Sequence, residues 1–589
     1  MIDRRPPYLT NEWLAANGIA DVRELLSDMR SEDEVMRPEV LRAIRPTRLS
    51  FSRSLMRRMI SERWKISLAH SSLDQAGVGT LVYEVSAAGH NLHFAVVSNA
   101  PDGPERSGRV CDMKYDFLGS LREGKPDSRA ISADLRELKE KIWLGRTGNA
   151  TLGWTVANRS SRFFDHVVDQ LSQGRQPQAK FLAGGGGYII RNAGWLGNGR
   201  FGSKSWLSLG PDHPLNQPYH SDIFALYLWR QVGHDVVEHI ARERGPRATV
   251  LSDHVRKSLG VGNSSGVGMV AALVRWPAWL SAYTFPRELA LGFAKRQLID
   301  AAAGTLAALR NLLDRAANYY DEQPASPVQE LADPRQLAKV FRSIIAFLNE
   351  YSVRGYKIRS VAERLLELAE AGGGLEGREQ MNSFFIELYP NFADAAAKLI
   401  PAAMAIPRRV QPHATVGEAR VLIEKHFGWA MSIDRNSPGA QKFFWYRSED
   451  VGENRRGERE LDPGLEKETF VDVTGSIQEL AIDLKSKADS ENISEFLIAH
   501  PNHAHAISRV QLADLLPYTE IRGNIIDAKF LPMDGIRFLL STMGLESSQP
   551  FNTQWVRGVF LQGAPDAAQV AEGSDEQWIY PSMKQTDAW

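Results

Sequence analysis

The chain has 589 residues, more than a single hydrophobic core usually supports, so its length predicts several structural units. Apolar side chains make up 43% of it and charged ones 24%, which excludes a disordered or fibrous chain. Its formal net charge is −1, which excludes the overall positive field that drives binding to nucleic acids or membranes.

Cysteine content and hydropathy narrow the class of protein further. Cys111 is the single cysteine, so an internal disulfide and a cysteine-built zinc or iron–sulfur centre are excluded. The N-terminal residues lack the continuous apolar run of a signal peptide. The most apolar long stretch, residues 267–285, contains Arg275 and Pro277 and therefore predicts a buried helix rather than a membrane span. We expect a cytoplasmic protein with no membrane or nucleic-acid partner.

The first predicted elements are helices within residues 21–63, and the second of these is basic and amphipathic. Phe51, Leu55 and Met59 fall on one of its faces. Residues 37–65 hold nine basic and two acidic side chains. A nucleic-acid face is one interpretation, but the neutral charge of the whole chain favours a solvated helix face or a subunit contact in a homo-oligomer.

A β-rich segment follows these helices. Residues 64–68, 80–86 and 92–98 are rich in strand-forming side chains, and residues 110–117 are a fourth candidate. Ala-Ala-Gly-His, a turn of hairpin length, joins the second segment to the third. We therefore predict an antiparallel sheet that completes, with the preceding helical arm, a first unit over residues 1–145.

The remaining sequence is mainly helical. Residues 146–404 combine glycine-rich loops with a helical core that begins near Asp222, and residues 405–589 are expected to form an α+β segment that ends in a surface tail. The boundary is placed at AIPRRVQPHA, residues 405–414, which has linker character. The sequence thus predicts an α+β fold, predominantly helical, with an N-terminal antiparallel β-rich segment, a central helical core and a C-terminal α+β segment.

Glycine density marks residues 184–205, GGGGYIIRNAGWLGNGRFGSKS. Such a run is costly in backbone entropy unless the backbone must approach something closely or adopt a positive φ. Residues 197–202 match GxGxxG, which cradles a phosphate when a strand precedes it and a helix follows, but no convincing helix follows here. A structural glycine turn is the alternative. The polar side chains of this stretch that we assign to substrate binding are Arg191, Asn192, Asn198, Arg200 and Lys204.

A second glycine-rich segment, residues 260–266, is expected to form a turn before an apolar helix. Ser264 and Ser265 are good caps for that helix, whose first amides favour either a cap or a bound anion. The segment also matches GxSxG, the motif that exposes a nucleophilic serine after a strand, although residues 253–259 predict a helix there. We assign Ser264 a catalytic role and Asn263 and Ser265 a role in substrate binding; a simple capped turn is the alternative.

Between these two segments lie His213, which we assign to substrate binding, and then His220 and Asp222 at the start of a helix. Apolar side chains surround the first two turns of this helix, so its N-terminal end is expected to be buried. A histidine and a carboxylate at a buried helix start can act as a general acid or base, because the carboxylate orients the imidazole. Helix capping by Asp222 or Ser221 is the alternative.

His500, His503 and His505 form the only histidine cluster that suggests a metal. On an extended strand His503 and His505 would share a face. No cysteine lies near, and the closest acidic residues in sequence are Glu495 and Asp514, so a polar strand or loop is the preferred interpretation and no metal site is assigned.

These features predict an enzyme that uses general acid/base chemistry on a small anionic or polar substrate, of lyase, hydrolase or isomerase type. In this hypothesis Arg191 and Arg200 hold the anion, Ser264 with neighbouring amides completes the site, and His220 with Asp222 transfers the proton.

Two alternatives stay open. The chain is either a non-enzymatic interaction module whose partner surface includes residues 37–65, or a nucleotide- or flavin-dependent enzyme; no other cofactor is evident. The enzymatic hypothesis requires residues 191–204, 213–222 and 262–266 to line one cavity.

Overall fold

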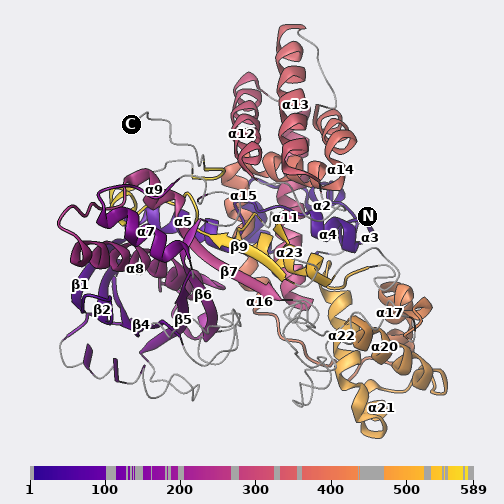
Figure 1. Ribbon diagram of the computed structural model, residues 1–589. Helices are drawn as coiled ribbons and strands as arrows, with labels where there is room; N and C mark the ends of the chain where they lie inside the picture. The colour runs from indigo at the N-terminus through magenta and orange to yellow at the C-terminus, as the bar shows by residue number, and fades with distance from the viewer. Residues whose placement is uncertain are drawn as a thin grey trace.

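A nine-stranded sheet runs through the part of the chain that the computed structural model describes, with helices over it and beyond it (Figure 1). The fold is therefore mixed α+β, as the sequence predicts. The structure describes residues 5–100, 115–127, 131–132, 135–136, 138, 150–160, 162–178, 182, 187–196, 205–266, 277–300, 302–323, 332–354, 361–435, 437, 470–522, 532–546, 549–550, 555–574 and 578–581. Among these residues, no helix combines the length and the apolarity needed to span a bilayer.

The strands of this sheet follow the order β1-β2-β3-β4-β5-β6-β7-β9-β8. Every neighbouring pair is antiparallel except β6 and β7, which are parallel. Their bounds are β1 Lys65–Leu73, β2 Gly79–Ala87, β3 His90–Ser98, β4 Phe117–Glu123, β5 Thr151–Arg159, β6 Tyr188–Leu196, β7 Gly260–Gly266, β8 Gln549–Pro550 and β9 Trp555–Phe560.

The first three strands confirm the predicted antiparallel segment. Ala88 and Gly89 connect β2 to β3 with positive φ angles of 49° and 84°, the backbone of a two-residue turn whose twist suits a hairpin. Apolar side chains of β2 and β3 are buried on both faces of the sheet: Tyr83 and Val85 join the main core, and Val82 joins a smaller core on the other face. Burial on both faces explains why apolar and polar residues do not alternate there.

Helix α8, His220–Arg244, makes the crossover between the parallel strands β6 and β7, together with α9, Asp253–Ser258. Gly233, midway along α8, lies against Ile189 at the start of β6. Trp229, one turn earlier in α8, donates to Thr155, which is paired with Trp195 near the end of β6, and α8 therefore runs antiparallel to that strand. The N-terminal end of α8 consequently points toward the side where β6 and β7 end. That end is buried, as the sequence predicts.

Several helices pack in a bundle beside the sheet, whereas α7 packs on α8 and β6. Helices α12, α13 and α14 stand together in Figure 1, above α11 and α15. The bounds are α1 Asn11–Ala16, α2 Val22–Ser27, α3 Glu32–Val35, α4 Pro38–Ala43, α5 Phe51–Ser61, α7 Phe163–Ser172, α11 Pro277–Gln297, α12 Ala303–Glu322, α13 Pro334–Arg354, α14 Val361–Glu387, α15 Pro390–Ala397, α16 Leu399–Met404, α23 Pro532–Met543 and α24 Ala567–Glu572, with short 3-10 turns η3 Ser205–Ser208 and η5 Leu298–Asp300.

A smaller group of helices lies apart from the sheet, at the lower right of Figure 1. It contains α17 at Val416–Phe427, where the sequence predicts a helix over the same residues, and a Thr415–Glu418 capping box starts that helix. The other members are η6 Gly428–Ser432, α20 Phe470–Lys485, α21 Ile493–Ala499, η7 Pro501–His503 and α22 Ala504–Leu515.

Two expectations about glycine are wrong. Residues 188–196 form strand β6, and residues 260–266 form strand β7 rather than a capped turn. Within α14, Gly374 leaves helical geometry, with φ 60°. The sheet takes strands from all three predicted units, because β9 is hydrogen bonded to β7; the division into units at 145 and 404 stays a prediction.

Candidate functional site

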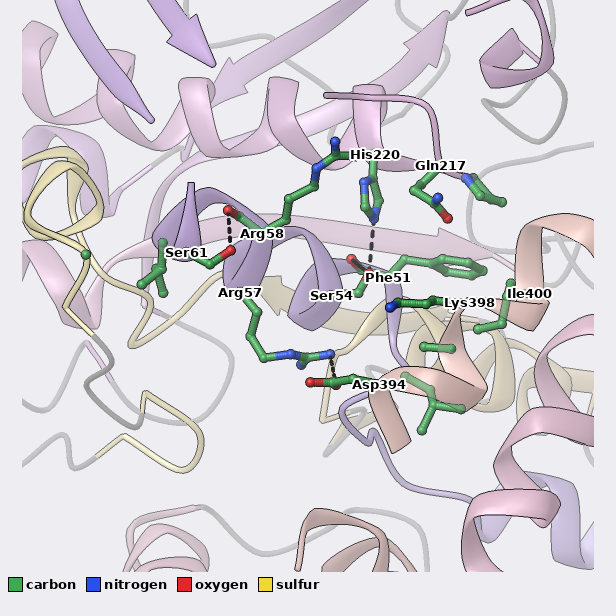
Figure 2. Close-up of a pocket in the computed structure, with 15 residues that line it drawn as sticks. Phe51, Ser54, Arg57, Arg58, Ser61, Gln217, His220, Asp394, Lys398 and Ile400 are labelled. Atoms are coloured by element: carbon green, nitrogen blue, oxygen red, sulfur yellow. Dashed lines mark hydrogen bonds and ion pairs between the residues drawn. The ribbon is translucent and has the colours of Figure 1, made fainter. Parts of the chain in front are cut away.

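A pocket of about 560 Å³ opens between helix α5, the start of α8 and the α15–α16 corner (Figure 2). Its volume lies in the range of small-molecule sites. The residues that line it are Leu49, Phe51, Ser54, Arg57, Arg58, Ile60, Ser61, Gln217, Pro218, His220, Asp394, Ala397, Lys398, Ile400 and Gly573.

Helix α5 presents its polar side to this pocket because its apolar side is committed to the core. Phe51, Leu55 and Met59 are buried, as the helical spacing predicts. Arg57 and Arg58 lie on the half-buried flank of the helix, between the core and the pocket. The amphipathic pattern of α5 therefore supplies two of the cations of the site.

Cations outnumber carboxylates on the pocket wall. Arg57 donates to Asp394 at 2.9 Å, and Arg48, behind the wall, holds the other oxygen of Asp394 at 2.9 Å. Arg58 pairs with Glu62 at 2.9 Å, one helical turn away. Lys398 is exposed, and its ammonium group has no ion pair or hydrogen bond to any residue in the described ranges. Three cations and one carboxylate thus face the space where a ligand would lie.

The crowding of cations is visible in the pKa of Arg57. Burial, and next the charge of Arg48, lower the pKa of Arg57 to about 10, against the opposing effect of Asp394. Burial is the larger cause of the shift, and the neighbouring Arg48 adds to it because a like charge disfavours the protonated guanidinium. An anion in the pocket would relieve this repulsion.

His220, the first residue of α8, points into the pocket next to Ser54 of α5 (Figure 2). Its Nε2 lies 3.0 Å from Ser54 Oγ. Burial, and next the charges of Arg58 and Arg57, lower the pKa of His220 to about 3. The imidazole is therefore neutral at pH 7 and able to accept a proton.

The hydroxyl of Ser54 has two acceptors within reach. Its Oγ lies 3.0 Å from the carbonyl oxygen of Phe51 and 3.0 Å from His220 Nε2, and its single proton serves one of them at a time. When Ser54 donates to Nε2, that nitrogen carries the lone pair and is the atom that can take a proton from a ligand. Nδ1 is buried without a hydrogen-bond partner in the described part of the chain.

The start of α8 lacks a side-chain cap, contrary to the expectation that Asp222 or Ser221 would serve as one. The cap position falls to Tyr219, whose left-handed backbone (φ 62°, ψ 0°) is uncommon for an aromatic residue. Its side chain makes no capping hydrogen bond. The positive end of a 25-residue helix therefore sits at His220, on the pocket wall, and adds to the attraction for an anion.

No contact between the Asp222 carboxyl and the His220 imidazole is found among the described residues. It is 8% exposed, it is not part of the pocket wall, and its Oδ2 has no hydrogen-bond partner among the described residues. Residues two apart on a helix point to different sides. Burial raises the pKa of Asp222 to about 7.

The other predicted site residues lie elsewhere or outside the described ranges. Arg191 and Asn192 belong to β6, and the Asn192 side chain accepts a hydrogen bond from Thr155 at 3.2 Å. None of the predicted residues on β6 or β7 lines the pocket. Asn263, Ser264 and Ser265 are consecutive residues of β7, paired with β9, whereas Asn198, Arg200 and Lys204 lie outside the described residues.

Close strand packing accounts for two of the glycines of β7. A Cβ at Gly260 would lie 2.3 Å from the carbonyl oxygen of Phe560, and one at Gly262 would lie 2.5 Å from the ring of Tyr188. The backbone approach that glycine permits is therefore made by neighbouring strands, with no ligand required.

His213 connects the loop before α8 to the end of β4 through a side-chain hydrogen bond. It is buried, and its Nε2 lies 2.7 Å from Glu123 Oε1. The Leu215 N–H donates to its Nδ1 at 3.0 Å. Because a backbone N–H can only donate, Nδ1 must be unprotonated and Nε2 must carry the proton that Glu123 accepts. Burial lowers the pKa of His213 in spite of Glu123.

The basic stretch of residues 37–65 is neither a simple solvated face nor an open surface. Arg45 is buried against Glu376 at 3.1 Å, and Arg53 is buried 3.4 Å from Glu387. Both carboxylates belong to α14, which is far away in sequence. The local sequence pattern of residues 37–65 therefore could not predict these ion pairs. The pocket residues on α5 were missed for the same reason, although the amphipathic basic helix itself was a usable signal.

The pocket combines excess positive charge, a helix N-terminus and a neutral buried histidine beside a serine hydroxyl. Such a set can hold a small anion and accept a proton from it. Comparisons with protein-family models, with curated proteins and with solved structures found no match to this chain.

Proposed function

We propose that the chain is an enzyme that binds a small anionic molecule in the α5–α8 pocket and uses His220 to transfer a proton. The observation that carries the proposal is the contact of 3.0 Å between His220 and Ser54 on a wall that also bears Arg57, Arg58 and Lys398. The anionic substrate class is the one predicted from sequence, but the cations that would bind it come from α5 and the α15–α16 corner.

Binding follows from charge and accessibility. Lys398 is exposed and Arg58 is half-buried, so both can reach a ligand while keeping their stems packed. Arginine suits the planar oxygens of a carboxylate or phosphate, and lysine supplies a point charge. The net positive wall favours a ligand with two negative charges over one with a single charge.

Proton transfer follows from the state of His220. A neutral imidazole with a low pKa is a weak base in the empty pocket. A bound anion offsets the charges of Arg57 and Arg58, which are part of the cause of the low pKa, and makes the imidazolium easier to form. The base is thus strengthened when the substrate is present. Proton removal and return is a step shared by lyases, hydrolases and isomerases, and the proposal is limited to that step.

The rival interaction module receives less support from the same residues. Arg45 and Arg53, which would belong to its basic surface, are buried in ion pairs within the chain. The GxGxxG residues of the nucleotide alternative, 197–202, include only residues outside the described ranges.

The test is calorimetric titration with inorganic phosphate, a sugar phosphate and a dicarboxylate, followed by turnover assays with any anion that binds. Lys398→Ala is expected to weaken binding about tenfold, because it removes one unshared charge. Lys125→Ala is the matched control, since Lys125 is an exposed lysine two residues beyond the end of β4 and is not part of the pocket wall. His220→Gln is expected to keep binding and lose turnover. Equal affinity of the wild type and Lys398→Ala for every anion, or full turnover by His220→Gln, would overturn the proposal.

A further inference from the structure

The three histidines near residue 500 lie at a helical corner, not on a strand as the sequence analysis considered. His500 ends α21, His503 closes the short turn η7, and His505 lies in the first turn of α22. His505 is exposed and contacts Arg408. The three imidazoles therefore do not share one face, and only those of His500 and His503 lie close to each other.

Asp483, from the last turn of α20, completes a different cluster with those two. Its Oδ2 lies 2.7 Å from His503 Nε2 and 3.8 Å from His500 Nδ1. One ligand atom from each of the three residues lies within 4.8 Å of the others. The sequence could not show this, because Asp483 precedes His500 by more than a helix and a loop.

The rings of the two histidines are held by packing. Both stack on Phe496, at ring-centroid distances of 4.8 Å for His500 and 5.8 Å for His503, with interplanar angles of 21° and 19°. Phe496 is fully buried, and the side chain of His503 is 3% exposed. A buried aromatic platform fixes the donors before any ligand arrives, which lowers the entropy cost of binding one.

A second cluster, His90, Glu123 and His213, has similar spacing, but the nitrogen of His213 that faces the cluster is protonated and cannot bind a metal ion. The Nε2 of His213 carries the hydrogen that Glu123 accepts, because Leu215 N–H occupies Nδ1. A metal ion needs the lone pair of the nitrogen that faces it. No backbone donor of this kind is found on His500 or His503 among the described hydrogen bonds.

We propose that Asp483, His500 and His503 bind one divalent transition-metal ion of the zinc class. Two imidazoles and a carboxylate suit zinc, and three protein ligands leave a position for water. Donors around a tetrahedral zinc ion stand about 3.3 Å apart. The observed separations of 2.7 and 3.8 Å fall on either side of this value, so side-chain shifts of about half an ångström would seat the ion. The ion would join the end of α20 to the α21–α22 corner.

The experiment uses the full chain without an affinity tag, titrated with zinc chloride by calorimetry and with cobalt(II) by visible absorption. One saturable site is expected, with the cobalt d–d band of a low-coordinate nitrogen–oxygen site. Asp483→Ala and His500→Ala are each expected to weaken zinc binding at least about tenfold. His500 is half-exposed, so its replacement is expected to leave the fold intact, as circular dichroism would check.

His505→Ala is the matched control, because His505 is a neighbouring histidine that the structure places outside the cluster. Its zinc affinity is expected to equal that of the wild type. Absence of a saturable site would overturn the proposal. So would a loss of affinity in His505→Ala as large as that in His500→Ala, because it would show scattered binding to surface histidines.

Discussion

Charged side chains occur in two contrasting settings in this protein: a closed cluster in the helical bundle and the open wall of the α5–α8 pocket. In the closed cluster Arg30 and Arg287 face Glu288 and Glu379, with Arg30 bonded to Glu288 at 2.8 Å and Arg287 to Glu379 at 2.8 Å. Glu288 and Arg287 are fully buried. Two cations and two carboxylates cancel there, and Asn382 fills one more acceptor position at 3.0 Å.

The pocket wall is not balanced in this way. Arg57, Arg58 and Lys398 meet the single carboxylate of Asp394, and Lys398 stays exposed. The comparison teaches that charge is compensated where water is excluded and left in excess where a ligand can enter. Changes in the closed cluster should therefore alter stability, and changes on the pocket wall should alter binding.

The largest expected effect is in the closed cluster. Burial alone would raise the pKa of Glu379, but Arg30 and Arg287 outweigh it and lower that pKa to about 2. Glu379→Gln would leave the two guanidinium groups with one carboxylate and is expected to reduce the free energy of unfolding by about 3–5 kcal/mol. Urea denaturation would measure it. Glu62→Gln, at the half-exposed pair with Arg58, is the control, with a loss of at most about 1 kcal/mol. Equal losses in the two variants would contradict the comparison.

Asp222 is a buried carboxyl that has no ion-pair partner among the described residues, so it is the opposite case to the closed cluster. Its folded pKa of about 7 lies above that of an unfolded chain, because burial penalises the carboxylate. The folded state then binds more protons between pH 4 and pH 7, and stability due to Asp222 falls as pH rises through that window.

Asp222→Asn removes this penalty. At pH 8 the variant is expected to be more stable than the wild type by at most about 4 kcal/mol, with the gain shrinking toward pH 4. His220 is present in both proteins, so its opposite pH dependence cancels in the difference. The measurement is the free energy of unfolding across this pH range. A gain that does not change with pH would show that the pKa of Asp222 is the same in the folded and the unfolded protein, and would contradict the burial penalty.

The smallest expected effect is at Asp394. Asp394→Asn removes the one carboxylate that the described residues place on the pocket wall, so affinity for a dianion such as phosphate is expected to rise by about 1 kcal/mol, or about fivefold. Stability is expected to fall by no more than about 1 kcal/mol, because the pairs with Arg48 and Arg57 are half-exposed. Titration calorimetry would check the affinity. Weaker phosphate binding in this variant would show that Asp394 holds the cations in place rather than opposing the ligand.

The local sequence pattern was sufficient to predict elements that are determined by neighbouring residues in the sequence. The β-branched and aromatic runs of β2 and β3, the Ala88–Gly89 turn and the helix of Val416–Phe427 were all predictable. Strands β6 and β7 were not, because their glycines suggest loops. The pairing that makes them strands involves Tyr188 and Phe560, which are distant in sequence from β7.

The site was predictable only in part for the same physical reason. His220 could be singled out from its place at a buried helix start. Its partner Ser54 is 166 residues away, and Lys398 lies on yet another element. Contacts between such positions depend on tertiary packing, which periodicity within one segment cannot reveal.

The most direct test of the account is an NMR titration of the His220 imidazole in protein labelled at histidine, with the signal assigned by its loss in His220→Gln. In buffer without anionic ligand, His220 is expected to stay neutral down to pH 5, because its pKa is about 3. Saturating phosphate is expected to shift its signals and raise its pKa, and Lys398→Ala to require about tenfold more phosphate for the same shift. A histidine that is already protonated at pH 6, or one that responds to no anion, would contradict the assignment of this pocket as the site.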